Sequence, residues 1–428
     1  MTTPQLTDAD IGRWYIKRRT DDTIAALGQW YRYKDGVWKD IHDLLIDREL
    51  WEIMEEFETR GQCRPTKNKK NSVLSRVQSQ LFVPDEMIDA NDDLINLANG
   101  VYDMQTGTLS AHDPKFYMTT QLPFNYDENA TAPMWQLYLA STFVKPDTTE
   151  SDPELINFLQ EAMGYSLTTS VKYHATFWCS GEGNNGKGVL FHILEQLAGD
   201  GAISLNIGLL KREQYQLAML AGKRIAMCSE SDATQNLVED ALIKSLVAGD
   251  TMNVRMIKQR PFMLHPKCKL WWSMNSLPAV ADSSHGFWRR VRLIPFNRVF
   301  TDQEKIVDLK SMLVTELPGI FNWVMVGLDR LRERGKFELP KQVSDRTELY
   351  KKESNPVAMF IEDECYIETD QSKAATMTAV YTSYKNWCFS NGYKAVASRR
   401  FKNEMLRMLH YTKKVAHGTI YVGLGLKI

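Results

Sequence analysis

The stretch that decides the fold is "CSGEGNNGKGVLFHIL", residues 179–194. The apolar run "HATFWCS" leads into its glycine-rich segment, and the run "GVLFHILEQLAG" continues from it at helical spacing. Strand, glycine-rich turn and helix in this order are the context in which G-x-x-x-x-G-K spacing binds phosphates. Backbone N–H groups of Gly181, Gly183 and Gly186 would face the phosphates at the start of the helix. The pattern predicts a nucleotide site rather than a structural turn.

This phosphate loop is expected to hold ATP, with Lys187 reaching the β- and γ-phosphates. Gly188 occupies the position where the usual pattern has Ser or Thr, whose hydroxyl ligates Mg²⁺ directly. We therefore expect Mg²⁺ to bind through water, phosphate oxygens and carboxylates from elsewhere in the chain. The expected ATP-binding residues are Gly181, Glu182, Gly183, Asn184, Asn185, Gly186, Lys187, Gly188 and Val189.

Three further segments carry the residues that hydrolysis of a bound nucleotide needs. The apolar run "RIAMCSESD" ends in Glu230 and Asp232, placed to order Mg²⁺ and activate water, although Asp232 alternatively caps the next segment. The run "KLWWSMN" ends in Asn275, a side chain suited to sensing the γ-phosphate or placing water. The segment "GFWRRVRLIPF" offers Arg289 and Arg290 ahead of a strand, and one of the two is expected to be structural.

Between the acids and Asn275, the runs "TMNVRMI" and "PFMLH" are predicted to form a β-hairpin. The hairpin has a basic tip, Lys258-Gln259-Arg260. The adjacent pair Trp271-Trp272 is interpreted as core around a strand rather than as a platform for stacking bases. His265 and His285 have no partners at metal-ligand spacing and are interpreted as ordinary polar residues.

In this order, the motifs resemble the superfamily III helicases. The likeness is greatest to the helicase part of phage and plasmid primase–helicases, which are related to the poxvirus NTPase/primase group. The upstream stretches "NLANGVYDMQTGTLSAHDP" and "FLQEAMGYSL" are also similar to the segment that precedes the helicase core in those proteins. The resemblance covers about residues 94–300, extends more loosely to the C-terminal end, and is faint over the first 80 residues.

The resemblance implies an AAA+ ATPase that assembles as a ring, with six subunits expected, around DNA. ATP would bind between subunits. Carried over residue by residue, Lys187 is the Walker A lysine, Glu230 the Walker B acid with Asp232 its companion, and Asn275 sensor 1. Arg289 or Arg290 is the finger that reaches the neighbour's γ-phosphate. Lys258 and Arg260 match the hairpin that grips DNA in the central channel.

The C-terminal end is the one strongly basic part of the chain. Residues 371–428 contain ten Lys and Arg and a single acid, Glu404. Their pattern predicts helix, turn, helix and two short β runs, which suggests a winged-helix domain. Arg399, Arg400 and Lys402 would face DNA phosphates, with Leu406 and Leu409 on the inner face of the second helix. The alternative is a solvated face on a small α/β domain.

The predicted architecture is an α/β fold with four regions. They are a small α/β module at 1–80, a β-hairpin and helical region at 81–150, the helicase ATPase domain at 151–345, and the basic winged-helix-like domain at 357–428. A basic stretch in the first region, "RPTKNKKNS", is interpreted as a solvated loop rather than a nucleic-acid contact.

Composition limits the remaining possibilities. The net charge is −1, so any contact with nucleic acid must come from local patches. Six scattered cysteines without a CxxC pair, the absence of a signal pattern and the absence of a long apolar run favour a cytoplasmic protein, here in a bacterial host, with no membrane contact.

The predicted function is that of an ATP-dependent replicative DNA helicase from a phage- or plasmid-type element. The roughly 90 residues before the core look too few for a polymerising primase, so a separate primase is expected. The alternative is a nucleotide-controlled initiator that binds or melts an origin with little processive unwinding. A small-molecule kinase is disfavoured because a basic hairpin and an arginine finger have no role in one.

Overall fold

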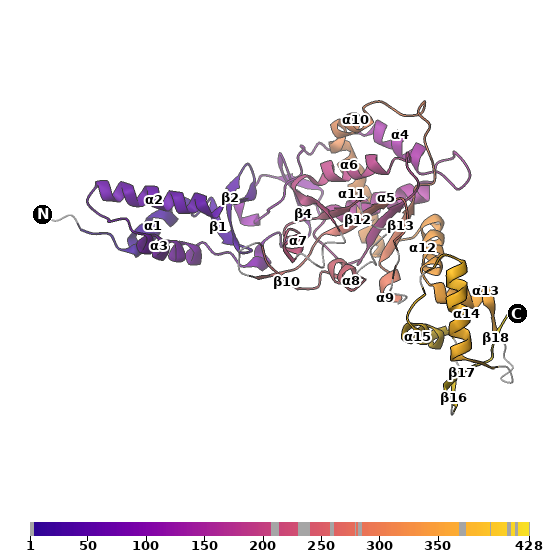
Figure 1. Ribbon diagram of the computed structural model, residues 1–428. Helices are drawn as coiled ribbons and strands as arrows, with labels where there is room; N and C mark the ends of the chain where they lie inside the picture. Colours follow the sequence, from indigo (N-terminus) through magenta and orange to yellow (C-terminus); the bar gives the residue numbers. More distant parts are fainter. Residues whose placement is uncertain are drawn as a thin grey trace. The chain divides into compact units, whose positions relative to one another are not determined.

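The computed structural model describes residues 4–206, 214–229, 240–256, 261–278, 280, 285–367, 374–393, 395–408, 412–415 and 418–427 (Figure 1). The chain forms two compact units. The first comprises Met1–Pro278 with Arg289–Val343, and the second comprises Ala279–Trp288 with Ser344–Ile428.

The first unit begins with three helices and a small antiparallel sheet of order β1-β2-β3. A hairpin turns at Asp35-Gly36 between β2 and β3, and both turn residues have positive φ, 52° and 82°, as a type I′ turn requires. The elements are α1 (Asp8–Arg19), β1 (Thr23–Ala26), β2 (Gln29–Lys34), β3 (Val37–Ile41), α2 (Asp43–Thr59) and α3 (Lys67–Gln80).

The loop predicted at "RPTKNKKNS" is wrong, because α3 begins there. Thr66 caps this helix by accepting a hydrogen bond from the backbone N–H of Lys69. Lys70 is buried and forms an ion pair with Asp47 of α2, which removes its charge from the surface. Most of the basic residues therefore lie in the first turn of α3, where one of them links α3 to α2 by an ion pair.

A second antiparallel sheet, β4-β5-β6, and two helices connect this region to the central sheet. Asp152 caps α5 by accepting from the backbone N–H groups of Glu154 and Leu155, with Pro153 in the first turn. The elements are η1 (Asp85–Met87), β4 (Leu94–Leu97), β5 (Gly100–Asp103), β6 (Thr108–Ser110), η2 (Pro114–Phe116), α4 (Pro133–Thr142) and α5 (Pro153–Leu167).

The centre of the unit is a five-stranded sheet of order β13-β7-β12-β9-β8, and all neighbouring strands run parallel. Buried parallel strands are covered on both faces, which explains their almost continuous apolar sequences. Of the six strands predicted between residues 172 and 300, four belong to this sheet and two form a separate hairpin, while the fifth strand of the sheet, β8, was not predicted. The sheet strands are β7 (Thr176–Ser180), β8 (Ala202–Leu205), β9 (Ile225–Cys228), β12 (Lys269–Met274) and β13 (Val291–Pro295).

One hydrophobic core joins this sheet to α4, α5, α6 and α11 (Figure 1). Within it α5 and α11 approach closely, because Gly164 and Gly327 have no side chain and a Cβ at either would overlap the backbone of the other helix. The helices between β7 and β12 are α6 (Lys187–Ala198), η3 (Gly199–Gly201), α7 (Gln214–Ala218) and α8 (Asp240–Ala248). Two further helices, α10 (Leu309–Thr315) and α11 (Leu317–Arg334), follow β13.

The predicted basic hairpin is present in its strands. β10 (Met252–Val254) and β11 (Phe262–Leu264) pair antiparallel, with Met252 opposite Leu264. The tip residues Lys258 and Arg260 lie outside the described residues.

The second unit contains the predicted helix, turn and helix, with Gly392 at φ 75° in the turn, followed by two antiparallel strands. The inner face of α15 differs from the prediction, since Leu406 is 42% exposed while Phe401, Glu404 and Met405 are buried. Leu409 lies outside the described residues. The elements are α9 (His285–Trp288), α12 (Lys341–Glu353), α13 (Pro356–Glu364), β14 (Cys365–Ile367), β15 (Ala374–Thr376), α14 (Met377–Ser390), α15 (Ser398–Met408), β16 (Thr412–Val415), β17 (Gly418–Val422) and β18 (Leu424–Leu426).

Across the described parts of the chain, no single helix combines the length and apolar composition needed to span a membrane. The helices α10 and α11 have the required length and apolar composition only when taken together, and a bend of 74° separates them.

Candidate functional site

The glycine-rich segment lies between the carboxyl end of β7 and the first residue of α6. Two of its glycines have no room for a side chain. A Cβ at Gly181 would lie 2.5 Å from the carbonyl oxygen of Phe296. Gly186 has φ 87°, and a Cβ there would lie 3.2 Å from both Thr142 and Tyr138. The bend of the loop therefore depends on these two glycines.

The other two glycines face open space. Nothing lies within 4 Å of a Cβ placed on Gly183 or on Gly188. Both positions have ordinary backbone conformations, because neither is among the glycines with positive φ. Gly188 is therefore not imposed by the fold, and its missing hydroxyl is a property of the site itself.

Lys187 and Asn275 meet beside this loop. The ammonium nitrogen of Lys187 lies 2.9 Å from Oδ1 of Asn275 and also donates to the carbonyl oxygen of Gly181. Lys187 is only 6% exposed. Its partner follows β12, which runs parallel to β7 as its direct neighbour, so the carboxyl ends of the two strands coincide. A buried ammonium group with an oriented amide at this edge is suited to hold an anion.

Two contacts that the sequence motifs did not predict support the loop from behind. The hydroxyl of Tyr138, on α4, donates to the carbonyl oxygen of Gly186 at 3.1 Å. Burial raises the pKa of this phenol, which therefore remains a donor at any physiological pH. On the other side, the backbone N–H of Phe300 donates to the carbonyl oxygen of Asn184 at 2.8 Å. The apolar spacing of "APMWQLYLASTF" indicated the helix but not which of its residues would reach the loop.

Arg289 and Arg290 lie away from Lys187. They immediately precede β13, whereas the glycine-rich loop follows β7, and the two strands are parallel. The backbone N–H of Thr176, the first residue of β7, donates to the carbonyl oxygen of Arg290. A five-residue strand is about 16 Å long, so the arginines lie at the amino ends of the strands and the loop at their carboxyl ends, on opposite edges of the sheet.

His174, which lies just before β7, is close to the two arginines. Burial, followed by the charge of Arg289, lowers the pKa of Arg290, while Asp250 acts in the opposite direction. Burial and the same two arginines also lower the pKa of His174.

The remaining predicted residues are only partly described. Glu230, Asp232, Lys258 and Arg260 lie outside the described residues. On α15, Arg399 is exposed and both Arg400 and Lys402 are half-buried. In the described ranges, no group of three His, Cys, Asp or Glu side chains is arranged to hold a metal. The interpretation of Trp271 and Trp272 as core is confirmed, since they are 0% and 2% exposed.

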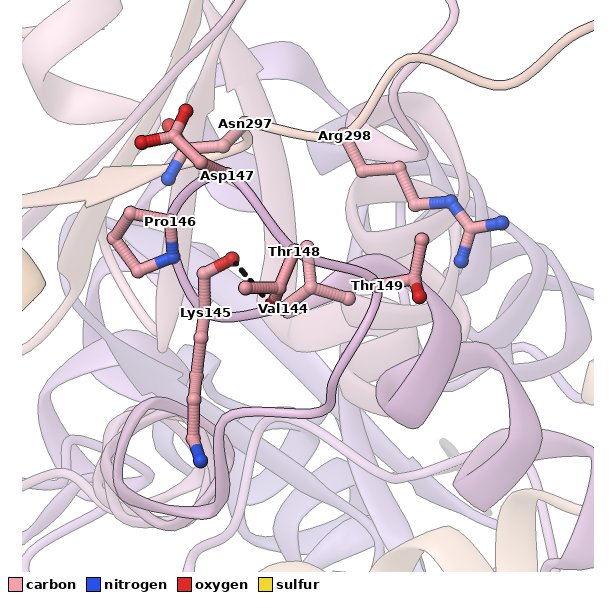
Figure 2. Close-up of a pocket in the computed structure, with 8 residues that line it drawn as sticks. All are labelled: Val144, Lys145, Pro146, Asp147, Thr148, Thr149, Asn297 and Arg298. Carbon is pink, nitrogen blue, oxygen red and sulfur yellow. Dashed lines mark hydrogen bonds between the residues drawn. The ribbon is translucent and has the colours of Figure 1, made fainter.

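A pocket of about 830 Å³ lies between two segments of the chain, each of which contacts the loop a few residues away (Figure 2). One wall is formed by residues 144–149, which follow α4, and the other by Asn297 and Arg298, which follow β13. Both walls connect to the loop through short chain segments, because Thr142 packs on Gly186 and Phe300 bonds to Asn184.

Comparisons with known families match three successive parts of the chain. Residues 11–144 match a model described as D5 N terminal like, and residues 352–419 match one described as poxvirus D5 protein-like. Residues 179–290, which include the glycine-rich loop, match a family of unknown function. The chain is similar to the D5-type viral helicases. This confirms the resemblance to primase–helicase-related helicases.

Individual D5-type relatives are distant. The candidate helicase 184R of Invertebrate iridescent virus 6 is 25% identical over 71% of this chain, and the candidate helicase L207/L206 of Acanthamoeba polyphaga mimivirus is 23% identical over 82%. The chain spans only 35% and 39% of these two proteins. Among solved structures, the NrS-1 C-terminal region has 12% sequence identity and a TM-score of 0.52, covering 98% of this chain and 100% of that one. That likeness supports a mixed α/β fold with a parallel sheet.

Proposed function

We propose that the chain is the ATPase core of a DNA helicase, of the superfamily III AAA+ type, acting in replication of a phage- or plasmid-type element. The observation that carries the proposal is the meeting of Lys187 and Asn275 beside a glycine-rich loop at the carboxyl edge of a parallel sheet. In open α/β sheets ligands bind at this edge. A lysine from the loop that follows one strand and a polar side chain at the end of the neighbouring strand are groups that phosphoryl transfer uses there.

The described residues fit a nucleoside triphosphate. The loop precedes α6, a helix of twelve residues whose N-terminal N–H groups attract phosphate. Lys187 already donates to two oxygens and would exchange them for phosphate oxygens. Mg²⁺ would neutralise phosphate charge, and Glu230 and Asp232 remain the residues proposed to hold it, through water.

The position of Arg289 and Arg290, at the edge of the sheet opposite the loop, supports a ring, for which we propose six subunits. Neither arginine serves the loop of its own chain across the sheet. A head-to-tail interface would bring the arginine edge of one chain to the loop edge of the next, and such interfaces close into rings. One of the two arginines would then stabilise charge on the neighbour's γ-phosphate.

Contacts with DNA are proposed for two places. The strands β10 and β11 support a hairpin whose basic tip, Lys258 and Arg260, would grip the strand in the channel through its phosphates. The second unit has the element order expected of a winged helix, and Arg399, Arg400 and Lys402 of α15 would contact phosphates there. A separate primase and a bacterial cytoplasmic location belong to the same proposal.

Substitution of Lys187 tests this function. Lys187→Ala is expected to lower ATP turnover by at least about a hundredfold, because it removes the charge that holds the β- and γ-phosphates. Turnover is measured as phosphate release with and without single-stranded DNA, and Lys310→Ala, an exposed lysine on α10, is the control. Full turnover in Lys187→Ala would contradict the assignment. Strong ATP binding without DNA-stimulated turnover in the unaltered chain would favour the origin-melting initiator instead.

A further inference from the structure

The pocket beside the loop contains an amide whose orientation is determined by its neighbours. Asn297 donates from Nδ2 to Oε1 of Gln342 at 2.9 Å. Gln342 in turn donates from Nε2 to a carboxylate oxygen of Asp152 at 2.6 Å and to the carbonyl oxygen of Val144 at 3.0 Å. These bonds run from the cap of α5 to the wall of the pocket.

This chain of bonds has one consistent direction. An ionised carboxylate and a carbonyl oxygen only accept hydrogen bonds, so the NH₂ group of Gln342 must face Asp152 and Val144. Its carbonyl oxygen then faces Asn297, which must turn its own NH₂ group toward it. With Nδ2 of Asn297 donating to Gln342, its Oδ1 is the acceptor that remains for a ligand.

The pocket is within reach of a nucleotide whose phosphates bind to the loop. Val144 is two residues from Thr142, which packs on Gly186, and Arg298 is two residues from Phe300, which bonds to Asn184. Two residues span at most about 7 Å. Arg298 also donates to the carbonyl oxygen of Ser141 at 2.8 Å, so the two walls are joined to each other as well as to the loop.

We propose that this pocket is the nucleoside subsite of the chain, and that Asn297 selects adenine, whose 6-position carries an amino group, over guanine, whose 6-position carries a carbonyl oxygen. The proposal rests on the proposed function, because it requires that phosphates bind to the loop. Figure 2 shows Asn297 extending toward Asp147 and Pro146 and Arg298 extending away from them. A base between these walls would contact the apolar ring of Pro146 and the amide of Asn297.

The selection follows from hydrogen-bond chemistry. Adenine carries an amino donor at the position where guanine carries a carbonyl acceptor. The acceptor Oδ1 of Asn297 pairs with the first and opposes the second. Gln342 prevents the amide from turning over to accommodate guanine, since that would place Oδ1 of Asn297 against Oε1 of Gln342.

The test compares binding of three probes, ATP, GTP and inorganic tripolyphosphate, to the full chain in the presence of Mg²⁺ by calorimetric titration. We expect ATP to bind about tenfold more tightly than GTP, the value of one hydrogen bond made or opposed. Asn297→Ala is expected to remove the difference between ATP and GTP and to leave tripolyphosphate binding unchanged. Asn129→Ala, an exposed asparagine outside the pocket, is the matched control.

The outcomes separate this inference from the function on which it rests. Equal affinities for ATP and tripolyphosphate in the unaltered chain would overturn the subsite while leaving phosphate binding at the loop intact. An ATP-to-GTP ratio that Asn297→Ala does not change would overturn the role of Asn297. Failure of all three probes to bind would overturn the phosphate loop and the subsite together. Unchanged tripolyphosphate binding also shows that the variant retains a folded loop.

Discussion

Gly188 is a glycine that the fold does not require. Gly181, at the start of the loop, has no room for a Cβ, whereas Gly188 faces open space. The fold therefore does not account for the missing hydroxyl at Gly188, and under the proposed function the metal would be held through water. The glycine-rich spacing predicted the loop, but only the structure distinguishes these two kinds of glycine.

Gly188→Ser is expected to fold and to be more stable by about 0.5 kcal/mol, because serine has a higher helix propensity than glycine and meets no neighbour. The added hydroxyl is also expected to lower the Mg²⁺ concentration needed for half-maximal ATP turnover. Urea unfolding and a Mg²⁺ titration measure the two effects. Gly181→Ala is the contrasting variant and should lose about 1–3 kcal/mol by overpacking. A destabilised Gly188→Ser would contradict the open space.

Lys269 is a second residue whose position has a measurable consequence. It is 1% exposed, donates to the carbonyl oxygens of Thr168 and Lys267, and lies near Arg224. Burial, and then the charge of Arg224, lowers its pKa to about 7. The unfolded chain therefore binds one more proton than the folded chain between about pH 7 and pH 10.5. Stability due to this lysine accordingly rises with pH across that window.

Lys269→Met is expected to remove this dependence. The difference in unfolding free energy between the variant and the unaltered chain should shift by about 3 kcal/mol in favour of the unaltered chain between pH 7 and pH 10. Urea unfolding at both pH values measures it. Lys310→Met, at an exposed position, should show the same difference at both pH values. A pH-independent difference for Lys269→Met would mean that the buried lysine keeps its ordinary pKa.

At the scale of elements, the sequence predicted strands better than their order. All strands of the central sheet and of the hairpin except β8 were predicted from apolar runs in the sequence. β8 was missed because "AISL" is only four residues long and has no alternation. α3 was taken for a loop because its basic residues hid the cap at Thr66. Sheet order could not be predicted at all, since it depends on contacts between strands that are distant in sequence.

The helix α15 offers the clearest test of a proposed DNA contact. Arg399→Ala is expected to weaken DNA binding similarly for different sequences and to reduce the slope of log affinity against log salt by about one, as for one phosphate contact. Fluorescence anisotropy over a range of salt concentrations measures it. Arg48→Ala, an exposed arginine on α2, is the charge-matched control. An effect confined to one DNA sequence would indicate a base contact instead.

At the scale of the whole molecule, the parallel sheet holds the two parts of the proposed catalytic site at opposite edges. Lys187 and Asn275 could be predicted together because both follow apolar strands, whose carboxyl ends coincide in a parallel sheet. The supporting contacts of Tyr138 and Phe300 could not, because they cross 48 residues and more than a hundred residues of chain respectively. The walls of the pocket were missed for the same reason.

Mixing inactive chains tests whether two chains complete one site. Lys187→Ala and the double variant Arg289→Ala/Arg290→Ala are each expected to lack ATP turnover. An equal mixture should regain about one quarter of the unaltered activity, because one in four head-to-tail interfaces pairs an intact loop with intact arginines. Phosphate release after mixing and reassembly measures it. A mixture as inactive as its components would place the arginines outside the site.

The position of β13 beside β7 also has a consequence for synthesis of the chain. All five residues of β7 are buried, and one of its edges pairs with β13, which is made more than a hundred residues later. Until then a growing chain presents an apolar strand with unpaired backbone groups, which other chains can extend. Truncation before Val291 should therefore yield aggregates rather than a smaller folded core, and expression trials of this protein should retain β13.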